Sequence, residues 1–387
     1  MIPAASNAMI MSRRHWLALA ALALTRTAFA KDVPRRALVG AIRWDAWYAP
    51  GSSVTSAVER SLSPEPYRWR RPFFSRQDET DHVHMPAISQ GLMDLEIAQA
   101  RYAGLDYWAF LAYPSDSTMT APLLHYLTST QRGDLRFCLF TELSAWGSRE
   151  EPAPLLNEQL RLMSNEAYLR VEDGRPLYYL GFITEQRAKE RWGGGDGLRH
   201  AIADLRVRGT ASGAGNPYIV VGVLPRDDIG FAASLGADAV GAYTIADGHM
   251  TGDYKALAQI AKDGWRVLAA TGLPVVPTVM AGWDRRPRVE TPVPWERSQR
   301  QGAGINYFFA SPQAPELAAH LREALDWQNA QPAGRRAPAV LIYAWNENDE
   351  GGWLVPTAPC DQARLEALHR LLRQGAAGDP PGCAWRE

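Results

Sequence analysis

The chain is poor in cysteine, with three among its 387 residues. This number excludes the dense disulfide framework that holds small secreted domains together. Such a framework is not needed, because a chain of this length with 46% hydrophobic residues can bury a large core. Cys138 stands in an apolar strand pattern and is predicted to be a small buried hydrophobic residue. Cys360 and Cys383 either pair in an oxidising compartment or stay free.

Apolar runs of membrane-spanning length are also missing. The run Leu17–Leu24 is too short, because a span takes about 20 apolar residues. It follows a pair of arginines and precedes Ala28-Phe29-Ala30, a small-x-small pattern typical of a signal-peptidase site. We therefore expect residues 1–30 to be an export signal cleaved after Ala30, either of the twin-arginine type or an ordinary secretory signal. The mature protein is then periplasmic or secreted, with no membrane span.

Neither sign of charge dominates, since 41 basic residues stand against 42 acidic ones. Loss of residues 1–30 removes three arginines and no acid, which leaves 38 against 42 and a net charge near −4. This balance argues against nucleic acid or an anionic membrane as a partner. The 14 tryptophans lean toward a ligand with flat apolar faces, such as a sugar ring, although packing of the core accounts for them equally well.

Signatures of cofactors and metals are absent too. Gly193-Gly194-Gly195 lacks the Lys-Ser or Lys-Thr of a phosphate-binding loop and is predicted to be a helix-to-loop break. The acids and histidines between Asp78 and His84 have no second ligand group at metal-binding spacing, so we predict a solvated loop. No cofactor and no metal are expected. Because no repeat or linker is visible, we predict one domain at 31–375 and a tail at 376–387. We also expect a monomer.

Short apolar runs alternate with amphipathic stretches along the chain. This alternation predicts parallel strands with crossover helices, and eight such strands close a (β/α)8 barrel. A doubly wound open sheet is the alternative, with Ile305–Ala310 as a further candidate strand. The eight predicted strands are Ala37–Ile42, Leu105–Ala112, Leu135–Phe140, Leu177–Phe182, Tyr218–Leu224, Ala237–Tyr243, Val275–Met280 and Ala339–Ala344, and the predicted helices are Gly91–Ala103, Ala121–Thr130, Leu155–Glu166, Glu185–Arg206, Asp228–Leu235, Asp253–Asp263 and Ala314–Gln328.

The last predicted strand ends in Trp345-Asn346-Glu347-Asn348-Asp349-Glu350-Gly351. An apolar run that stops in carboxylates and glycine is typical of a buried strand that delivers acids to a barrel mouth. Cleavage of a sugar acetal needs one carboxylic acid and one carboxylate, so Glu347 and Glu350 are the predicted catalytic pair. The plain alternative is two acids on a solvated loop. The extra charge of Asp349 is expected to raise the pKa of a neighbour and so to help keep Glu350 protonated.

Active sites of such barrels lie in the loops that follow the strands, so the residues after the other strands are candidate substrate ligands. Aromatic and acidic side chains gather at this end of the predicted barrel. Asp284 has an alternative role, which is to pair with Arg285, Arg286 or Arg288 and shape its loop. The candidate substrate-binding residues are Trp44, Asp45, Tyr48, Tyr113, Glu142, Trp283, Asp284, Trp345 and Asn346, and Thr244 and Asp247 follow the sixth strand.

The segment Asn346-Glu347-x-x-Glu350-Gly351 resembles the signature of glycoside hydrolase family 99 and of the related WbsX-like proteins of bacterial polysaccharide loci. Supporting likenesses lie in Asp94–Tyr107, Asp173–Pro176 and Val276–Pro287, so the resemblance spans most of the mature chain. It implies a single barrel that cleaves α-linked mannosides or similar glycans with retention and without metal. The chain departs from the pattern at Asn348, where tryptophan is usual.

The resemblance also implies a role for each glutamate. Glu347 is the base that deprotonates the sugar 2-hydroxyl, whose oxygen then attacks the anomeric carbon. Glu350 is the acid that protonates the leaving group and later the base that activates water. The partner is then an oligo- or polysaccharide substrate.

Two other functions stay open at this point. One is a catalytically inactive glycan-binding protein that uses the same site. The other is a glycosyltransferase, a label attached to some WbsX-like relatives. The sequence holds no recognisable Asp-x-Asp metal motif in a nucleotide-binding context, and an exported enzyme would lack nucleotide-sugar donors. The sequence therefore favours an exported glycoside hydrolase.

Overall fold

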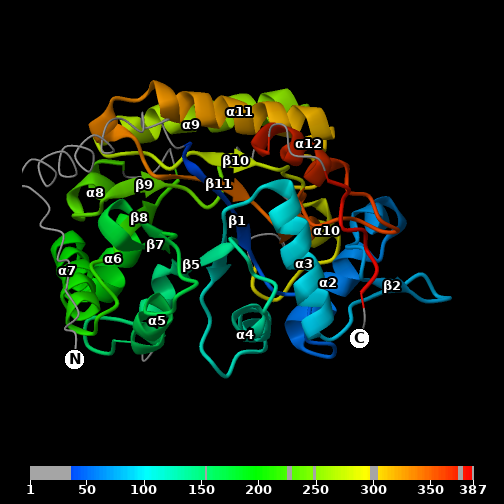
Figure 1. The fold of residues 1–387 in the computed structure, drawn as a ribbon, viewed down its shortest axis with the longest axis horizontal. Coiled ribbons are helices and arrows are strands. Elements are labelled where there is room, and N and C mark those ends of the chain that lie inside the picture. The colour runs from blue at the N-terminus through cyan, green and yellow to red at the C-terminus, as the bar shows by residue number, and fades with distance from the viewer. Residues whose placement is uncertain are drawn as a thin grey trace, which may run out of the picture. The chain divides into compact units, whose positions relative to one another are not determined.

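Eight parallel strands form the central sheet of the computed structural model (Figure 1). The structure describes residues 36–152, 155–224, 229–246, 250–296, 304–373 and 378–385. The predicted export signal, its cleavage site and Asp247 lie outside these residues. In the order in which they pair, the strands are β10 (Thr278–Met280), β11 (Ala339–Tyr343), β1 (Leu38–Arg43), β4 (Tyr107–Leu111), β5 (Arg136–Glu142), β7 (Arg175–Gly181), β8 (Tyr218–Gly222) and β9 (Ala239–Gly241).

Backbone contacts between β9 and the segment before β10 close this sheet into a barrel. Val240 forms a parallel bridge with Val275, and the Val276 N–H donates to the Val240 carbonyl at 2.9 Å. The predicted (β/α)8 barrel is therefore confirmed, and each predicted strand overlaps an observed one. The candidate strand at Ile305–Ala310 is wrong, because that segment pairs only through an isolated bridge between Phe309 and Gly252.

Helices lie outside the sheet in Figure 1. The helix before β4 was predicted at Gly91–Ala103. It begins where the Ser89 side chain accepts from the Leu92 N–H, and it ends at Gly104, which has a left-handed φ of 89°. The predicted helix Glu185–Arg206 is two helices, because Gly193 ends the first with a φ of 73°. The helices are α2 (Ser53–Leu62), α3 (Gln90–Ala103), α4 (Ala121–Thr128), α5 (Leu155–Met163), α6 (Glu185–Trp192), α7 (Gly195–Ala211), α8 (Ile229–Ser234), α9 (Tyr254–Ala269), α10 (Arg286–Glu290), α11 (Ala314–Ala330) and α12 (Ala363–Leu372).

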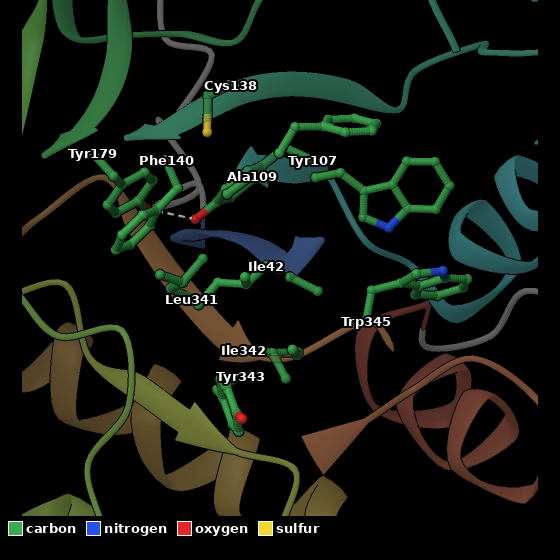
Figure 2. Packing of buried hydrophobic residues seen from close by; sticks show 14 of the residues in the cluster. Ile42, Tyr107, Ala109, Cys138, Phe140, Tyr179, Leu341, Ile342, Tyr343 and Trp345 are labelled. Carbon is green, nitrogen blue, oxygen red and sulfur yellow. Dashed lines mark hydrogen bonds between the residues drawn. The ribbon is translucent and has the colours of Figure 1, made fainter. Parts of the chain in front are cut away.

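Large side chains fill the barrel interior (Figure 2). The Tyr107 and Tyr179 hydroxyls are 2.8 Å apart, and Tyr107 also donates to the Val340 carbonyl at 3.0 Å. Gly40 leaves room for the Tyr107 ring, because a Cβ at Gly40 would lie 2.4 Å from the atoms of that ring. Cys138 is buried in the same core, as predicted. The interior is thus packed with side chains, so a ligand site is left to the loops at one end.

Short elements complete the fold around these loops. Two antiparallel hairpins, β2–β3 and β12–β13, lie outside the barrel sheet, and β6 extends it beside β7. The 3-10 helix η1 follows α2. Their bounds are β2 (Arg76–Gln77), β3 (Val83–His84), β6 (Arg170–Val171), β12 (Asn346–Glu347), β13 (Gly352–Trp353) and η1 (Glu65–Arg70).

A disulfide joins Cys360 to Cys383, which decides between the two alternatives left open by the sequence. The tail also packs on the barrel, since Trp385 meets Phe73 edge-on at 5.7 Å and Gln99 donates to the Gly382 carbonyl at 2.8 Å. Within the part of the chain that the structure describes, no helix has the length and apolarity of a membrane span. Within that part, no group of His, Cys, Asp or Glu side chains has an arrangement suited to a metal ion.

Candidate active site

A tight hairpin at the end of β11 carries Glu347 and Glu350. Asn346 and Glu347 pair antiparallel with Gly352 and Trp353, and a 3-10 turn over Asn348–Glu350 joins the two short strands. The hairpin continues directly from β11, since the Trp345 N–H donates to the Ile42 carbonyl of β1 at 2.6 Å. Both glutamates are therefore positioned by the barrel itself and not by a free loop.

The hairpin interlocks with the loop after β10. A Cβ at Gly351, where φ is 89°, would lie 2.5 Å from the Asp284 backbone nitrogen. A Cβ at Gly282, where φ is 142°, would lie 2.0 Å from the Gly351 carbonyl oxygen. The Asp284 N–H donates to the Glu350 carbonyl at 2.7 Å. Glycine at both positions is thus required for the two loops to meet.

Both glutamates are buried, with 3% of Glu347 and 7% of Glu350 exposed. The Tyr243 hydroxyl donates to one Glu347 oxygen, and Arg288 Nη2 donates to the other at 3.3 Å. The Tyr343 hydroxyl donates to one Glu350 oxygen, and Arg288 Nη1 donates to the other. The alternative interpretation of two acids on a solvated loop is therefore wrong.

Arg288 of α10 is the centre of a larger group, which we call the carboxyl–guanidinium cluster. Arg288 Nε and Nη2 contact the two oxygens of Asp349 at 2.7 and 3.0 Å, and neither side chain is more than 3% exposed. Arg288 also lies 2.8 Å from Glu296, which in turn accepts from Arg285. Arg285 Nε is 3.2 Å from Glu350. The cluster consists of Arg285, Arg288, Glu296, Glu347, Asp349 and Glu350.

The two glutamates of the hairpin have opposite pKa shifts. Burial, and next the charge of Glu350, raises the pKa of Glu347 well above its ordinary value. Burial also acts to raise the pKa of Glu350, but Arg285, Arg288 and the Tyr343 hydroxyl outweigh it and lower this pKa to about 2. Our expectation that Asp349 helps to keep Glu350 protonated is therefore wrong. The reason is that Arg288 forms an ion pair with Asp349, which neutralises the Asp349 charge, and also contacts Glu350.

Aromatic side chains flank the cluster. The Arg288 guanidinium lies 4.7 Å from the Trp44 ring, and Trp44 meets Trp295 edge-on at 5.5 Å. Trp44 Nε1 donates to the Tyr113 hydroxyl at 2.8 Å. The Trp283 ring lies 5.8 Å from the ring of Tyr343. The predicted Trp44, Tyr113 and Trp283 are thus gathered around the glutamates.

Three other candidate ligands lie beneath the site and support it. Tyr48 donates to Glu96 at 2.8 Å, and Trp345 Nε1 donates to the same carboxylate at 3.0 Å. The fully buried Arg43 links this carboxylate, at 2.8 Å, to Asp45, at 2.7 Å. Burial raises the pKa of Asp45 to about 7, against the lowering effect of Arg43. Tyr48 and Trp345 are therefore packing and hydrogen-bonding supports for the strand ends.

Asn346 has a similar supporting position. Its Oδ1 accepts from the Trp44 N–H at 2.8 Å, and its carbonyl accepts from Trp47 Nε1 at 2.9 Å. Its Nδ2 lies 3.5 Å from the Asp45 carboxylate. Asn346 thus joins the end of β1 to the hairpin that carries Glu347.

The remaining predicted acids are engaged by arginines. Arg70 holds the Asp284 carboxylate, and Arg286 contacts it at 2.7 and 2.9 Å, which matches the loop-shaping alternative. Of its three proposed partners, only Arg286 pairs with Asp284. Glu142, at the end of β5, is partly exposed and lies 3.2 Å from Arg187.

The sequence reasoning missed four groups that contact the glutamates or their arginines. Tyr243 and Tyr343 stand at the ends of predicted strands, so their position was a usable signal. Arg288 was considered only as a partner of Asp284, and Glu296 was not considered. No local pattern marks Arg288, because its contacts with Glu347 and Glu350 reach 59 and 62 positions along the chain. Glu296 enters the site by contacting Arg288 and Arg285, which stand 8 and 11 positions before it.

The chain matches no protein-family model and no curated protein. Among solved structures, it is similar to the glycoside hydrolase family 99 endo-α-mannosidase of Bacteroides thetaiotaomicron. One structure, in complex with bis-tris propane, has a TM-score of 0.52 at 13% identity and covers 87% of this chain and 96% of that one. A second structure has a TM-score of 0.51 at 14% identity, with 87% and 95% covered. At such identities the likeness concerns the fold, which this chain shares with that endo-α-mannosidase.

Proposed function

We propose that this chain is an exported glycoside hydrolase that cleaves an α-linked glycan, such as a mannoside, with Glu347 and Glu350 as its base and acid/base pair. The observation that carries the proposal is the burial of these two glutamates in unlike environments at the C-terminal end of a barrel. Pairs of titratable groups with pKa values pushed apart are typical of acid–base catalysis. The likeness in fold to an endo-α-mannosidase points the same way.

The proposed reaction retains the configuration at the anomeric carbon. In the first step, the base takes the proton of the sugar 2-hydroxyl, and this oxygen bonds to the anomeric carbon. The bond to the leaving oxygen breaks, and the acid gives that oxygen a proton. In the second step, the deprotonated acid takes a proton from water, whose oxygen attacks the anomeric carbon. The bond from the 2-oxygen breaks, and the 2-hydroxyl regains its proton from the base.

The cluster meets the central requirement of this scheme, which is one protonated and one ionised carboxyl group. The raised pKa of Glu347 and the lowered pKa of Glu350 provide that combination near neutral pH. The resemblance assigns the acid role to Glu350, whereas these pKa directions place the proton on Glu347. Kinetics on different leaving groups separates the two assignments, because a good leaving group needs no acid.

The flanking aromatic groups fit a sugar ligand. Trp283 is partly exposed, and 38% of Trp295 is exposed beside the buried Trp44. Indole faces bind the apolar faces of pyranose rings, so we propose that the sugar lies against Trp283 and Trp295. Tyr113 offers its hydroxyl to the same region through its bond to Trp44.

A screen with aryl α-glycosides and bacterial polysaccharides tests the proposal. We expect the mature protein to release sugar, and Glu347→Gln and Glu350→Gln each to lose about 100-fold or more in rate. Glu366→Gln, on the surface helix α12, is the matched control and should keep full activity. The leaving group of a dinitrophenyl glycoside needs no protonation, so on this substrate only the variant that lacks the acid should regain a rate of bond cleavage close to that of the unchanged protein.

The outcomes also separate the rival functions. Equal sugar release by the unchanged protein and both glutamate variants would refute the catalytic assignment. Sugar binding that survives Glu350→Gln, without turnover by the unchanged protein, would identify a glycan-binding protein. Turnover that requires a nucleotide-sugar donor would identify a glycosyltransferase.

Export is the part of the proposal that rests on residues 1–30 and on the disulfide. The Cys360–Cys383 bond fits an oxidising compartment, where disulfides form and persist. Mass spectrometry of the protein recovered from the periplasm should show an N-terminus at Lys31. Recovery of the uncleaved chain in the cytoplasm would refute export.

A further inference from the structure

Glu296 is a third glutamate held by the arginines that contact the catalytic pair. It lies in the chain after α10, and each of its oxygens faces an arginine: Oε1 is 2.8 Å from Arg288 Nη1, and Oε2 accepts from Arg285 Nη2. The same two arginines contact Glu350, and Arg288 Nη1 donates to Oε1 of both glutamates. The side chain of Glu296 is 15% exposed against 9% for Glu350.

The charges of the carboxyl–guanidinium cluster require protons. Four carboxyl groups face two guanidinium groups, and the nearby Tyr243 and Tyr343 are neutral hydroxyl donors. If all four acids were ionised, a net charge of −2 would remain in a buried site, which is very unfavourable. Two protons make the cluster neutral. Asp349 is held bidentately by Arg288, so the groups left to carry these protons are Glu296, Glu347 and Glu350.

We propose that Glu296 is a positioning residue that supplies the proton which Glu350 donates to the leaving group. This inference rests on the proposed function and deepens it. Geometry supports it, because Arg288 Nη1 donates to an oxygen of both Glu296 and Glu350, and Arg285 contacts both carboxylates as well. The resemblance implies that Glu350 acts as an acid, whereas Arg285 and Arg288 favour its ionised form. A neighbouring proton source accounts for both.

The proton balance of the step is closed. With the sugar bound, Glu347 is ionised as the base, and the two protons of the cluster are on Glu296 and Glu350. As the glycosidic bond breaks, Glu347 takes the proton of the sugar 2-hydroxyl, Glu350 gives its proton to the leaving oxygen, and the proton of Glu296 passes to Glu350. When water attacks, Glu350 returns a proton to Glu296 and takes one from the water, and Glu347 returns its proton to the 2-oxygen. No oxidant, metal or further co-reactant takes part. Burial, and next the charge of Glu350, raises the pKa of Glu296 to about 7, so Glu296 holds its proton in neutral solution and below.

The first test compares Glu296→Gln with Glu296→Asp and with Glu290→Gln. Glu290 is an exposed residue that bonds to Tyr67 at 2.5 Å, outside the cluster, so it is the matched control. On an unactivated alkyl α-mannoside, we expect Glu296→Gln to lose about 100-fold, Glu296→Asp to retain most activity, and Glu290→Gln to match the unchanged protein. On a dinitrophenyl α-mannoside, Glu296→Gln should stay within about threefold of the unchanged protein.

The pH profile supplies the readout that a purely structural role would not move. Activity of the unchanged protein on the alkyl mannoside should fall as pH rises through about 7, and Glu296→Gln should remove that inflection. The same inflection in both proteins, or an equal loss on both substrates, would overturn the proposal.

The second test reads protonation without turnover, so it stays valid if the chain proves not to be a hydrolase. In protein labelled with carboxyl-13C glutamate, the signal missing from Glu296→Gln identifies Glu296. We expect this signal to titrate near pH 7 and the Glu350 signal to show a second inflection at the same pH. The proposal would be overturned if Glu296 titrated at the ordinary pKa of a glutamate, or if the Glu350 signal showed no inflection at the pH where Glu296 titrates. Failure of the proposed function would instead appear as absent turnover with the titration unchanged.

Discussion

Arg288→Met removes the guanidinium at the centre of the carboxyl–guanidinium cluster and keeps an apolar stem beside Trp44. Asp349, which is fully buried, then loses both of its short contacts. Removal of one partner from a buried ion pair costs about 3–5 kcal/mol, because the other charge is left unpaired in the interior. Glu350 keeps Arg285, so it adds less to this cost. We therefore expect the free energy of unfolding to fall by about 3–5 kcal/mol.

A double-mutant cycle isolates this interaction. Asp349→Asn leaves Arg288 paired with Glu350 and Glu296, so we expect a loss of only about 1–2 kcal/mol. The double variant has no unpaired carboxylate at position 349, and its loss should be smaller than the two single losses together by at least about 1 kcal/mol.

Urea unfolding at pH 7, followed by tryptophan fluorescence and far-ultraviolet circular dichroism, measures these differences. Equal denaturant slopes in all four proteins are the control that the unfolding transition itself is unchanged. Single losses that add within about 0.5 kcal/mol would refute the reasoning, because they would show that Arg288 and Asp349 act independently. An unchanged midpoint for Arg288→Met would refute it as well.

Three further predictions follow from burial, backbone geometry and the disulfide. Burial lowers the pKa of His320 to about 3, whereas a histidine in the unfolded chain has a pKa near 6.5, so the stability present above pH 6.5 falls as the pH drops toward 3. Thermal unfolding at pH 8 and pH 5 should therefore show that the protein loses about 2 kcal/mol at pH 5, and His320→Leu should remove this loss. Gly282→Ala places a Cβ against the Gly351 carbonyl oxygen at a residue with positive φ, so chemical denaturation should show that the free energy of unfolding falls by about 2 kcal/mol or more. An unchanged stability would show that the two loops do not require glycine at this position. Replacing both Cys360 and Cys383 with alanine opens a loop of 23 residues, and under non-reducing conditions we expect this to lower the free energy of unfolding by about 3 kcal/mol. If the double variant were less stable than the unchanged protein by the same amount in the presence of reductant, the loss would not come from the disulfide.

The barrel could be predicted from the sequence because its strands carry a strong local signal. Runs such as Ala339–Ala344 are apolar on both faces, as strands covered by helices on one side and a packed interior on the other must be. Because this run stops at Glu347 and Glu350, the position of the candidate site could be predicted from the sequence for the same local reason. Short or irregular segments carry less signal, so α10 and the β12–β13 hairpin were not predicted.

The electrostatics of the site could not be predicted in the same way. Asp349 stands next to Glu350 in sequence, so local reasoning counts its charge as a repulsion. The structure brings Arg288 from 61 positions away to neutralise it. Likewise, Tyr48 and Trp345 follow strands and are polar enough to suggest sugar ligands, but both reach inward to Glu96 on α3. Which way a side chain points after a strand end is decided by partners that are distant in sequence.

Asn348 stands where the signature that this segment resembles usually has tryptophan, and its contacts show what asparagine does at this position. The side chain is fully buried, and its Nδ2 donates to the Arg70 carbonyl of η1 at 2.6 Å. Arg70 in turn holds Asp284, whose loop carries Trp283. An indole at position 348 would have to displace η1 from the hairpin, because the interior has no free volume for the larger group. Asparagine here therefore ties η1 to the hairpin and, through Arg70 and Asp284, to the loop that carries Trp283.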